Sequence, residues 1–197
     1  MLKYLSILVM SATLLSSEAM ANAVHLNPAQ SPDTSSMMTF GKTKIPLGYY
    51  EFCQRYETDC RVPGQPGVIK LTEQSWRDIV RINAEANFTV SPRTDAEIYG
   101  VEERWEYPTT EGDCEDYVLL KRRQLLEKGF PAGALLITVA RDAEGGGHAV
   151  LTVRTDLGDV ILASVEKKIL LWKGAELYYR NRQSPSDPNR WESPVQG

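Results

Sequence analysis

Residues 111–129 of the chain read EGDCEDYVLLKRRQLLEKG, and this stretch decides how the rest of the sequence is interpreted. It predicts a helix from about Cys114 to Lys128, which ends at the stop signal GFP that begins with Gly129. A lone cysteine therefore stands at a helix start between acidic residues. The helix N-terminus lowers the pKa of a thiol, whereas acidic neighbours raise it. Whether this thiol reacts depends on what the rest of the chain places beside it.

Three β-strands are expected on the carboxyl side of this helix. They are ALLITVA at residues 134–140, HAVLTVR at 148–154 and VILAS at 160–164, all rich in apolar and β-branched residues. The connections RDAEGGG and TDLGD are short and turn-like, so the three strands should form an antiparallel meander. Another strand is expected within residues 172–179, and RQSPSDPNRW, residues 182–191, is interpreted as a loop.

One clear helix is expected on the amino side, within LTEQSWRDIVRINAEANF, residues 71–88. Its predicted face follows the i, i+3, i+4, i+7 spacing and consists of Trp76, Ile79, Val80, Asn83 and Ala86. The sequence SPRTDAEIYG then breaks the pattern with Pro92 and Gly100. Helices followed by antiparallel strands predict a single α+β domain, in which N-terminal helices pack on an antiparallel β-sheet, over residues 45–197.

The start of the chain predicts export. Residues 1–21 combine an early lysine, an apolar run and the small-residue pattern AMA, which indicates a secretory signal peptide cleaved after Ala21. The alternative, a membrane anchor, needs a longer apolar core. No other segment approaches that length, so we expect no stable membrane insertion and a periplasmic location. Residues 22–44 are weakly patterned and predict a loose leader.

Composition excludes one class of partner. The chain is 42% hydrophobic and 24% charged, which is ordinary for a globular domain. Its net charge is −4, from 22 basic and 26 acidic residues. No basic patch of the kind that binds nucleic acid is apparent.

Export also changes how the three cysteines are interpreted. In an oxidising compartment, the close pair Cys53 and Cys60 predicts a disulfide. The alternative is a metal-binding pair, for which the sequence offers no second pair of ligands. Cys114 is then left over, and an odd thiol in an exported protein is either intermolecular or reactive.

The chain has two histidines, and one of them is placed to work with Cys114. His25 falls in the expected leader, whereas His148 opens the second expected strand, directly after three glycines. A cysteine at a helix start followed by a histidine at a strand start is typical of a thiol hydrolase, because the imidazole can take and return the thiol proton. The alternative is a structural pair: a buried cysteine that packs as a small apolar residue, and a histidine held in the core.

Longer motifs resemble a known family. GYYEFCQRY, YPTTEGDCEDYVLLKRRQLLEKG, GHAVLTVRTDLGDVIL and RQSPSDPNRW resemble the bacterial transglutaminase-like cysteine proteinases, over about residues 47–192. The resemblance implies a papain/transglutaminase-like core with a Cys-His-Asp triad. Cys114 would be the nucleophile, and His148 the general base and acid.

The resemblance also implies calcium. In this family, acidic residues that flank the cysteine are tied to Ca²⁺, which points to Asp113 and Glu115, with Asp116 as a weaker candidate. Hard carboxylate oxygens suit this ion. The alternative is that these acids only complement the positive end of the helix.

One departure from the family pattern concerns the triad itself. The family has a Leu-Asp-Asn step where this chain has Leu162, Ala163 and Ser164, so that Ala163 occupies the position of the triad aspartate. Asp159 lies four residues away along the strand and is a poor substitute. Disabling the aspartate of a serine protease triad lowers turnover about 10⁴-fold.

Three functions therefore stay open. The first is a periplasmic, calcium-dependent cysteine endopeptidase that clips a large surface adhesin and so controls biofilm attachment. The resemblance implies that an inner-membrane receptor that senses cyclic-di-GMP would sequester it. The second is an inactive pseudoprotease that binds a partner or regulates, and the third is a transglutaminase or amidase on the same core.

Overall fold

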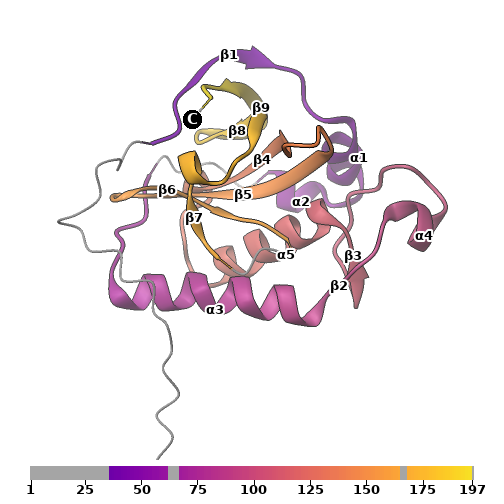
Figure 1. Ribbon diagram of the computed structural model, residues 1–197, viewed down its shortest axis with the longest axis horizontal. Helices are drawn as coiled ribbons and strands as arrows, with labels where there is room; N and C mark the ends of the chain where they lie inside the picture. The colour runs from indigo at the N-terminus through magenta and orange to yellow at the C-terminus, as the bar shows by residue number, and fades with distance from the viewer. Residues whose placement is uncertain (1–35, 62–66, 165–167, 197) are drawn as a thin grey trace, which may run out of the picture. The chain divides into compact units, whose positions relative to one another are not determined.

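The computed structural model describes residues 36–61, 67–164 and 168–196. The expected signal peptide, residues 1–21, lies outside the described residues, as does the leader up to residue 35. A seven-stranded antiparallel sheet with the order β1-β9-β8-β4-β5-β6-β7 forms the centre of the described domain (Figure 1). Its strands are β1 (Thr39–Thr43), β4 (Leu135–Arg141), β5 (Gly147–Thr155), β6 (Gly158–Leu162), β7 (Leu170–Leu171), β8 (Tyr178–Ser184) and β9 (Asp187–Pro194).

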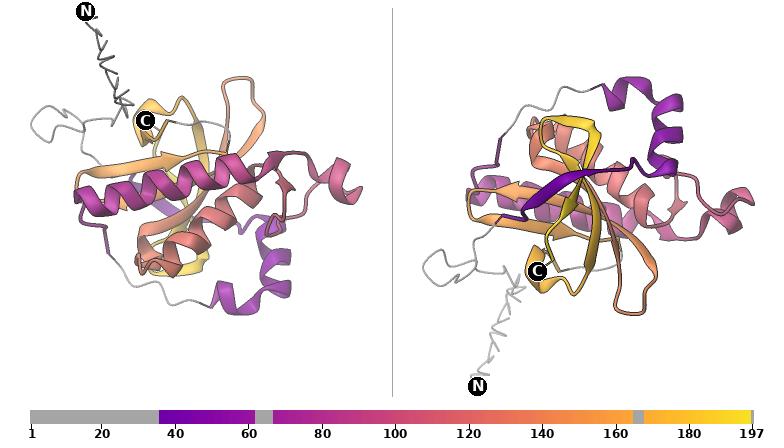
Figure 2. Two further views of the ribbon diagram at one scale, coloured as in Figure 1. Left: turned by 90° about the horizontal axis from the view of Figure 1, so that it is seen from below. Right: turned by 90° about the horizontal axis from the view of Figure 1, so that it is seen from above.

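Helices cover one face of this sheet. Helix α5 packs against β5, and α3 packs against α5, which is visible in the two further views of Figure 2. The helices are α1 (Leu47–Arg55), α2 (Glu57–Cys60), α3 (Glu73–Thr89), α4 (Asp95–Tyr99) and α5 (Cys114–Glu127), with 3₁₀ turns at Ala132–Ala134 and Trp172–Gly174. A small parallel pair, β2 (Ser91–Pro92) and β3 (Glu111–Gly112), lies before α5. The predicted α+β fold, with helices packed on an antiparallel sheet, is confirmed.

The predicted central helix forms α5 almost as expected. Lys128 caps its end, and Gly129 follows with φ +87°, a left-handed conformation that favours glycine. Val118 and Leu125 are fully buried in the core that α5 shares with the sheet. On β5, Ala149 and Leu151 belong to the same core. The helix is therefore held by the apolar face that its sequence presents to β5.

The predicted first helix is confirmed as α3, with a change in its buried face. Thr72 caps it, accepting a hydrogen bond from the Ser75 N–H. The face that meets the core includes Ile79 and Ile82, whereas Val80 is 41% exposed. The prediction for Val80 is wrong because a core on one side selects a single stripe of residues, and Ile82 completes that stripe.

The predicted loop at residues 182–191 is wrong. The strands β8 and β9 pair there as a hairpin, with Gln183 opposite Trp191. The Gln183 side chain accepts from the Ile137 N–H at 2.9 Å and donates to the Pro188 carbonyl at 3.0 Å. A polar side chain that is buried and fully bonded hides the alternation by which a strand is recognised in sequence. The strand expected within residues 172–179 begins only at β8, after a 3₁₀ turn.

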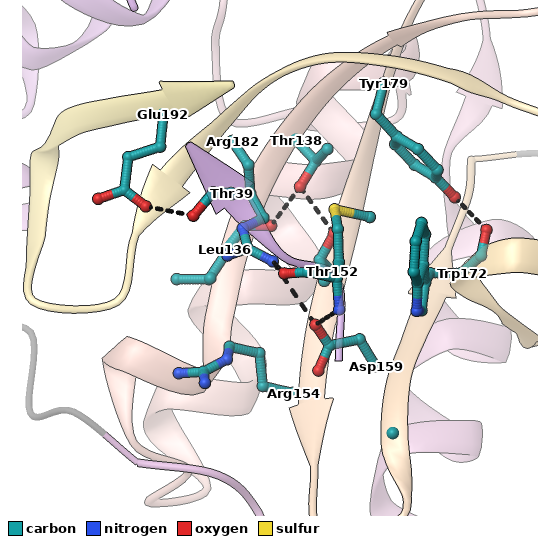
Figure 3. Close-up of polar contacts among 12 residues, drawn as sticks. Thr39, Leu136, Thr138, Thr152, Arg154, Asp159, Trp172, Tyr179, Arg182 and Glu192 are labelled. Carbon is teal, nitrogen blue, oxygen red and sulfur yellow. Dashed lines mark hydrogen bonds and ion pairs between the residues drawn. The ribbon is translucent and has the colours of Figure 1, made fainter. Parts of the chain in front are cut away.

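The described part of the expected leader is not loose. Residues of β1 pair with β9, and Met37 is buried against the second face of the sheet. Its N–H donates to Asp159 at 2.9 Å, and its carbonyl accepts from Arg182 at 2.6 Å (Figure 3). Partners far along the chain therefore order this segment, and its own composition gave no sign of them.

The disulfide prediction is confirmed, and two short helices that the sequence did not announce carry it. Cys53 in α1 is bonded to Cys60 in α2, with their Cα atoms 5.7 Å apart, while Cys114 is free. Among the described residues, no helix is both long enough and apolar enough to span a bilayer.

Candidate active site and metal site

Cys114 is the first residue of α5, and its sulfur lies against the start of β5. The Ala149 N–H donates a hydrogen bond to Cys114 Sγ at 3.2 Å. Ala149 directly follows His148, so the thiol lies beside the backbone next to the histidine position. The strand β6 stops pairing with β5 at the Leu151–Leu162 pair, and beyond it the thiol meets this side of β5.

The register of β5 and β6 places His148 on the other face of the sheet from Ala149. Side chains alternate along a strand, so His148 and Val150 share one face. Leu151 pairs with Leu162, which sets Ala163 opposite Val150. His148 and Ala163 therefore share a face, as the two-residue turn between β5 and β6 requires. His148 is half-buried, and Ala163 packs at the edge of the apolar cluster on that face.

The electrostatics around the thiol favour its neutral form. Burial raises the pKa of Cys114 well above its usual range, and the charge of Glu115 adds to the rise. The thiol donates to Glu115 Oε2 at 3.2 Å. Burial in turn lowers the pKa of His148. Glu115 itself has its pKa raised to about 9, by burial first and then by the charges of Asp113 and Glu103.

Three further carboxylates converge beside the helix start. One oxygen each of Asp95, Asp113 and Asp116 lies within 4.8 Å of the others. Each residue also has one buried oxygen, Oδ1, Oδ1 and Oδ2 respectively, without a hydrogen-bond partner in the part of the chain that is described. Buried carboxylate oxygens are normally paired, so these three unpaired oxygens indicate a candidate cation site. A set of hard oxygen donors suits Ca²⁺.

The remaining oxygens of this group are held by backbone N–H groups. Glu106 donates to Asp116 Oδ1 at 2.8 Å, Asp95 donates to Asp113 Oδ2 at 3.3 Å, and Arg104 donates to Asp95 Oδ2. Burial raises the pKa of Asp95 to about 6 and that of Asp116 to about 8. Both shifts reflect carboxylates whose negative charge lacks compensation, which a bound cation would supply.

Local sequence explains why these residues meet. The parallel pairing of β2 with β3 sets Pro92 beside Gly112, and α4 begins three residues later with Asp95. Gly112 cannot carry a side chain, because a Cβ there would lie 2.7 Å from Asp116 Oδ2. The glycine of GDCEDY thus makes room for the carboxylate two positions beyond the cysteine.

The structure gathers some of the predicted metal residues and adds one. Asp113 and the weaker candidate Asp116 lie in the three-carboxylate group. Glu115 lies beside it, turned to the thiol. Asp95 was missed because SPRTDAEIYG was interpreted only as a helix break. Its signal was the Thr94 and Glu97 capping box, which starts a helix at Asp95.

Trp105 has the core role that buried tryptophans usually have. It is 2% exposed and packs edge-on against Tyr49, with ring centroids 5.8 Å apart. A Cβ on Gly48 would lie 2.3 Å from its ring, so α1 approaches the indole closely.

Two solved structures are similar to this chain in fold. LapG from Legionella pneumophila in its calcium-bound form matches with a TM-score of 0.53 and 26% identity, over 62% of this chain and 71% of LapG. A second LapG structure from the same organism matches at 28% identity with a TM-score of 0.48, over 54% of this chain and 64% of that one, so this chain spans less than two thirds of its length. A comparison with curated protein sequences finds no match.

The match to a family model covers more of the chain than the matches to solved structures. A model of the family described as bacterial transglutaminase-like cysteine proteinase matches residues 39–196, which include every strand of the main sheet and all five helices of the described domain. The calcium-bound LapG likeness agrees with a transglutaminase-like core. This chain belongs to the bacterial transglutaminase-like cysteine proteinase family.

Proposed function

We propose that this protein is a calcium-dependent cysteine endopeptidase with Cys114 as nucleophile and His148 as general base and acid. The observation that carries the proposal is the contact between Cys114 Sγ and the Ala149 N–H, which sets the thiol beside the histidine position. Membership of a cysteine proteinase family supports the same reaction.

The reaction follows from the two side chains. His148 takes the proton of the Cys114 thiol, and the thiolate attacks the carbonyl carbon of a peptide bond. The peptide C–N bond breaks as the imidazolium returns its proton to the leaving amine, and a thioester forms. Water, deprotonated by His148, then hydrolyses the thioester and frees the thiol. Burial raises the pKa of Cys114 and lowers that of His148, which favours the neutral forms from which this proton transfer starts.

Ca²⁺ would be held by Asp95, Asp113 and Asp116, with Glu115 beside them. Their unpaired buried oxygens fit a hard cation, and a structural relative is calcium-bound LapG. The ion would supply positive charge that keeps the carboxylates ionised and favours the thiolate. The backbone N–H groups of residues 104 and 106 hold the carboxylates of Asp95 and Asp116 in place.

Location and substrate are inferred from the sequence. Residues 1–21 would be removed as a signal peptide on export to the periplasm. The mature chain would then start at residue 22, and its catalytic domain would include β1 in addition to the predicted residues 45–197. The Cys53–Cys60 disulfide supports an oxidising compartment. The substrate would be a large surface adhesin, clipped near its N-terminal retention segment to release the cell from a biofilm. An inner-membrane receptor that senses cyclic-di-GMP would sequester the protease.

Cleavage of an adhesin fragment tests this function. Mature protein from residue 22 is incubated with a fragment that carries the retention segment, in Ca²⁺ or in EGTA, and the products are mapped by mass spectrometry. We expect one defined cut in Ca²⁺, little in EGTA and none with Cys114→Ala. Equal cleavage by the Cys114→Ala variant would refute the assigned nucleophile.

A pseudoprotease is the second candidate, and one residue favours it. Ala163 stands where the family's aspartate would orient the histidine. If the protein is inactive, a thiol-reactive probe should label Cys114 at the same slow rate in Ca²⁺ and in EGTA, and the adhesin fragment should bind without being cut.

A further inference from the structure

We propose that Asp142 is the carboxylate that orients His148 in this protein, in place of the aspartate that the chain lacks at Ala163. Asp142 is thus a positioning residue, and its role rests on the proposed proteolysis. The position lies in the connection between β4 and β5, on the other side of β5 from Ala163.

The strand register sets the two side chains on one face. Ala140 of β4 pairs with His148 of β5, and Arg141 pairs with Gly147. Asp142 follows two residues after Ala140, so it points to the same face as His148. The two residues are diagonal neighbours, a relation that separates positions by about 7–8 Å and lets long side chains interact.

The turn itself holds the Asp142 carboxylate. Its Oδ1 accepts a hydrogen bond from the Gly146 N–H at 2.7 Å, and the Asp142 N–H donates to the Gly146 carbonyl at 3.1 Å. A Cβ on Gly146 would lie 2.7 Å from Asp142 Oδ2, so only glycine leaves room for the carboxylate there. Gly145 adopts φ +86°, which also favours glycine. Gly145 and Gly146 therefore leave room for the carboxylate of Asp142 in this turn.

The charge of Asp142 acts on the histidine. Burial lowers the pKa of His148, and the Asp142 carboxylate opposes that fall. On α5, Cys114 and Glu115 approach the start of β5 from the neighbouring side. At Ala163, β6 offers no charged side chain. The thiol meets β5 on its β6 side and Asp142 lies on its β4 side, so the strand that carries His148 lies between the nucleophile and the carboxylate.

The first test measures His148 without relying on activity. His25 and His148 are the only histidines, so a His25→Gln background of the mature protein leaves one imidazole signal for titration by nuclear magnetic resonance. Asp142→Asn, which keeps the acceptor for Gly146, should lower the measured pKa of His148. Glu144→Gln, an equal change of charge in the same connection, should leave it where it is. Gly146→Ala should lower it in part, because the new Cβ displaces the carboxylate.

The second test measures turnover on the adhesin fragment in Ca²⁺. Asp142→Asn should lower kcat at least tenfold with little change in KM, within the ~10⁴-fold limit set by loss of an orienting aspartate. Adding Ala163→Asp to Asp142→Asn should restore much of the loss, since either carboxylate can then orient the ring.

The outcomes separate this inference from the proposed function. An unchanged His148 pKa in Asp142→Asn overturns the inference, whether or not the wild type cleaves the fragment. A full kcat in Asp142→Asn overturns it as well. A lowered pKa in a protein that cleaves nothing supports the pairing of Asp142 with His148 and instead overturns the proteolytic function.

Discussion

At the residue scale, Asp95 shows what burial does to a carboxylate. Its Oδ1 is buried without a partner in the described chain, and its pKa is raised to about 6 by burial first. It destabilises the domain at neutral pH until a cation compensates its charge. The nearby Asp113 and Asp116 each also have a buried oxygen without a partner in the described chain, so the group as a whole should respond to Ca²⁺.

Replacing Asp95 should have opposite effects with and without the ion. In EGTA, Asp95→Asn should raise the melting temperature, because it removes an uncompensated buried charge. In Ca²⁺ it should lose most of the rise that the wild type shows, which is worth about 2.7 kcal/mol at a concentration one hundred times the Kd. Calorimetry in both buffers measures this, with the exposed Glu102→Gln as control. A full calcium response in Asp95→Asn would remove Asp95 from the site.

Lys121 carries a buried amine whose protonation should be visible in stability. Its Nζ donates to the Ala163 carbonyl at 2.6 Å, and burial lowers its pKa to about 7. Between that value and the unfolded value near 10.4, the unfolded chain binds a proton that the folded chain lacks. The free energy of unfolding should therefore rise with pH in this window, by up to about 1.4 kcal/mol per pH unit from this residue.

Lys121→Met should flatten that dependence. Urea unfolding at pH 7 and pH 8.5 should show a smaller difference in the variant than in the wild type, because the titrating group is gone. Lys128→Met, at an exposed position where the same helix ends, should keep the wild-type difference. Identical slopes in the wild type and in Lys121→Met would contradict the assignment.

At the element scale, the disulfide-bonded pair of short helices braces the metal site. Arg55 donates to the Trp105 carbonyl at 2.5 Å, and Tyr107 donates to Asp59 at 2.8 Å. Tyr56 donates to Glu106, which also pairs with Arg55 at 3.4 Å. The same segment supplies the N–H groups that hold the metal carboxylates. Ordering of α1 and α2 should therefore help to order the candidate calcium site.

Removing the disulfide should weaken calcium binding. The double variant Cys53→Ser and Cys60→Ser loosens α1 and α2, so more of the binding free energy goes into ordering the segment. We expect the Kd for Ca²⁺, measured by isothermal titration calorimetry, to rise about fivefold or more. The reduced wild type should have the same Kd for Ca²⁺ as the variant, and reductant should not change the Kd of the variant. An equal Kd in all three samples would show that the brace is not coupled to the site.

Helices and strands with a clear apolar periodicity were predicted from sequence. Elements that depend on partners far along the chain were not. α3, α5 and β4 to β6 carry strong apolar periodicity and a clear stop signal, so their types and approximate bounds were right. The sequence of the β8–β9 hairpin shows this pattern poorly, because Arg182 and Gln183 are buried polar residues whose partners lie far along the chain. The same holds for the candidate site. Asp113 could be predicted because it precedes Cys114 in the sequence, whereas Asp95 comes near the other carboxylates only through the pairing of β2 with β3.

At the scale of the whole described domain, the first and last strands are neighbours. β1 pairs with β9, and Met37 just before β1 is clamped by Asp159 of β6 and Arg182 of β8 (Figure 3). Helices cover one face of the sheet, and this clamp closes part of the other. His148 lies on the clamped face, while the thiol reaches β5 from the helix side. The residues of the candidate site therefore come from both faces of the sheet.

Removing one partner of the buried ion pair between Arg182 and Asp159 should destabilise the fold more than removing both. Arg182 Nη1 and Asp159 Oδ2 lie 3.5 Å apart, and both side chains are buried, so a lone remaining charge is uncompensated. Arg182→Met should lower the free energy of unfolding by about 3–5 kcal/mol. Adding Asp159→Leu should recover part of that loss, because no unpaired charge stays behind. The matched control is Arg190→Met, which removes the 47% exposed Arg190 side chain from its pair with Glu192 and should cost about 1 kcal/mol or less. Urea unfolding of the four proteins completes the comparison. A double variant that is less stable than Arg182→Met would mean that Asp159 contributes chiefly through its bond to the Met37 N–H and not through its charge.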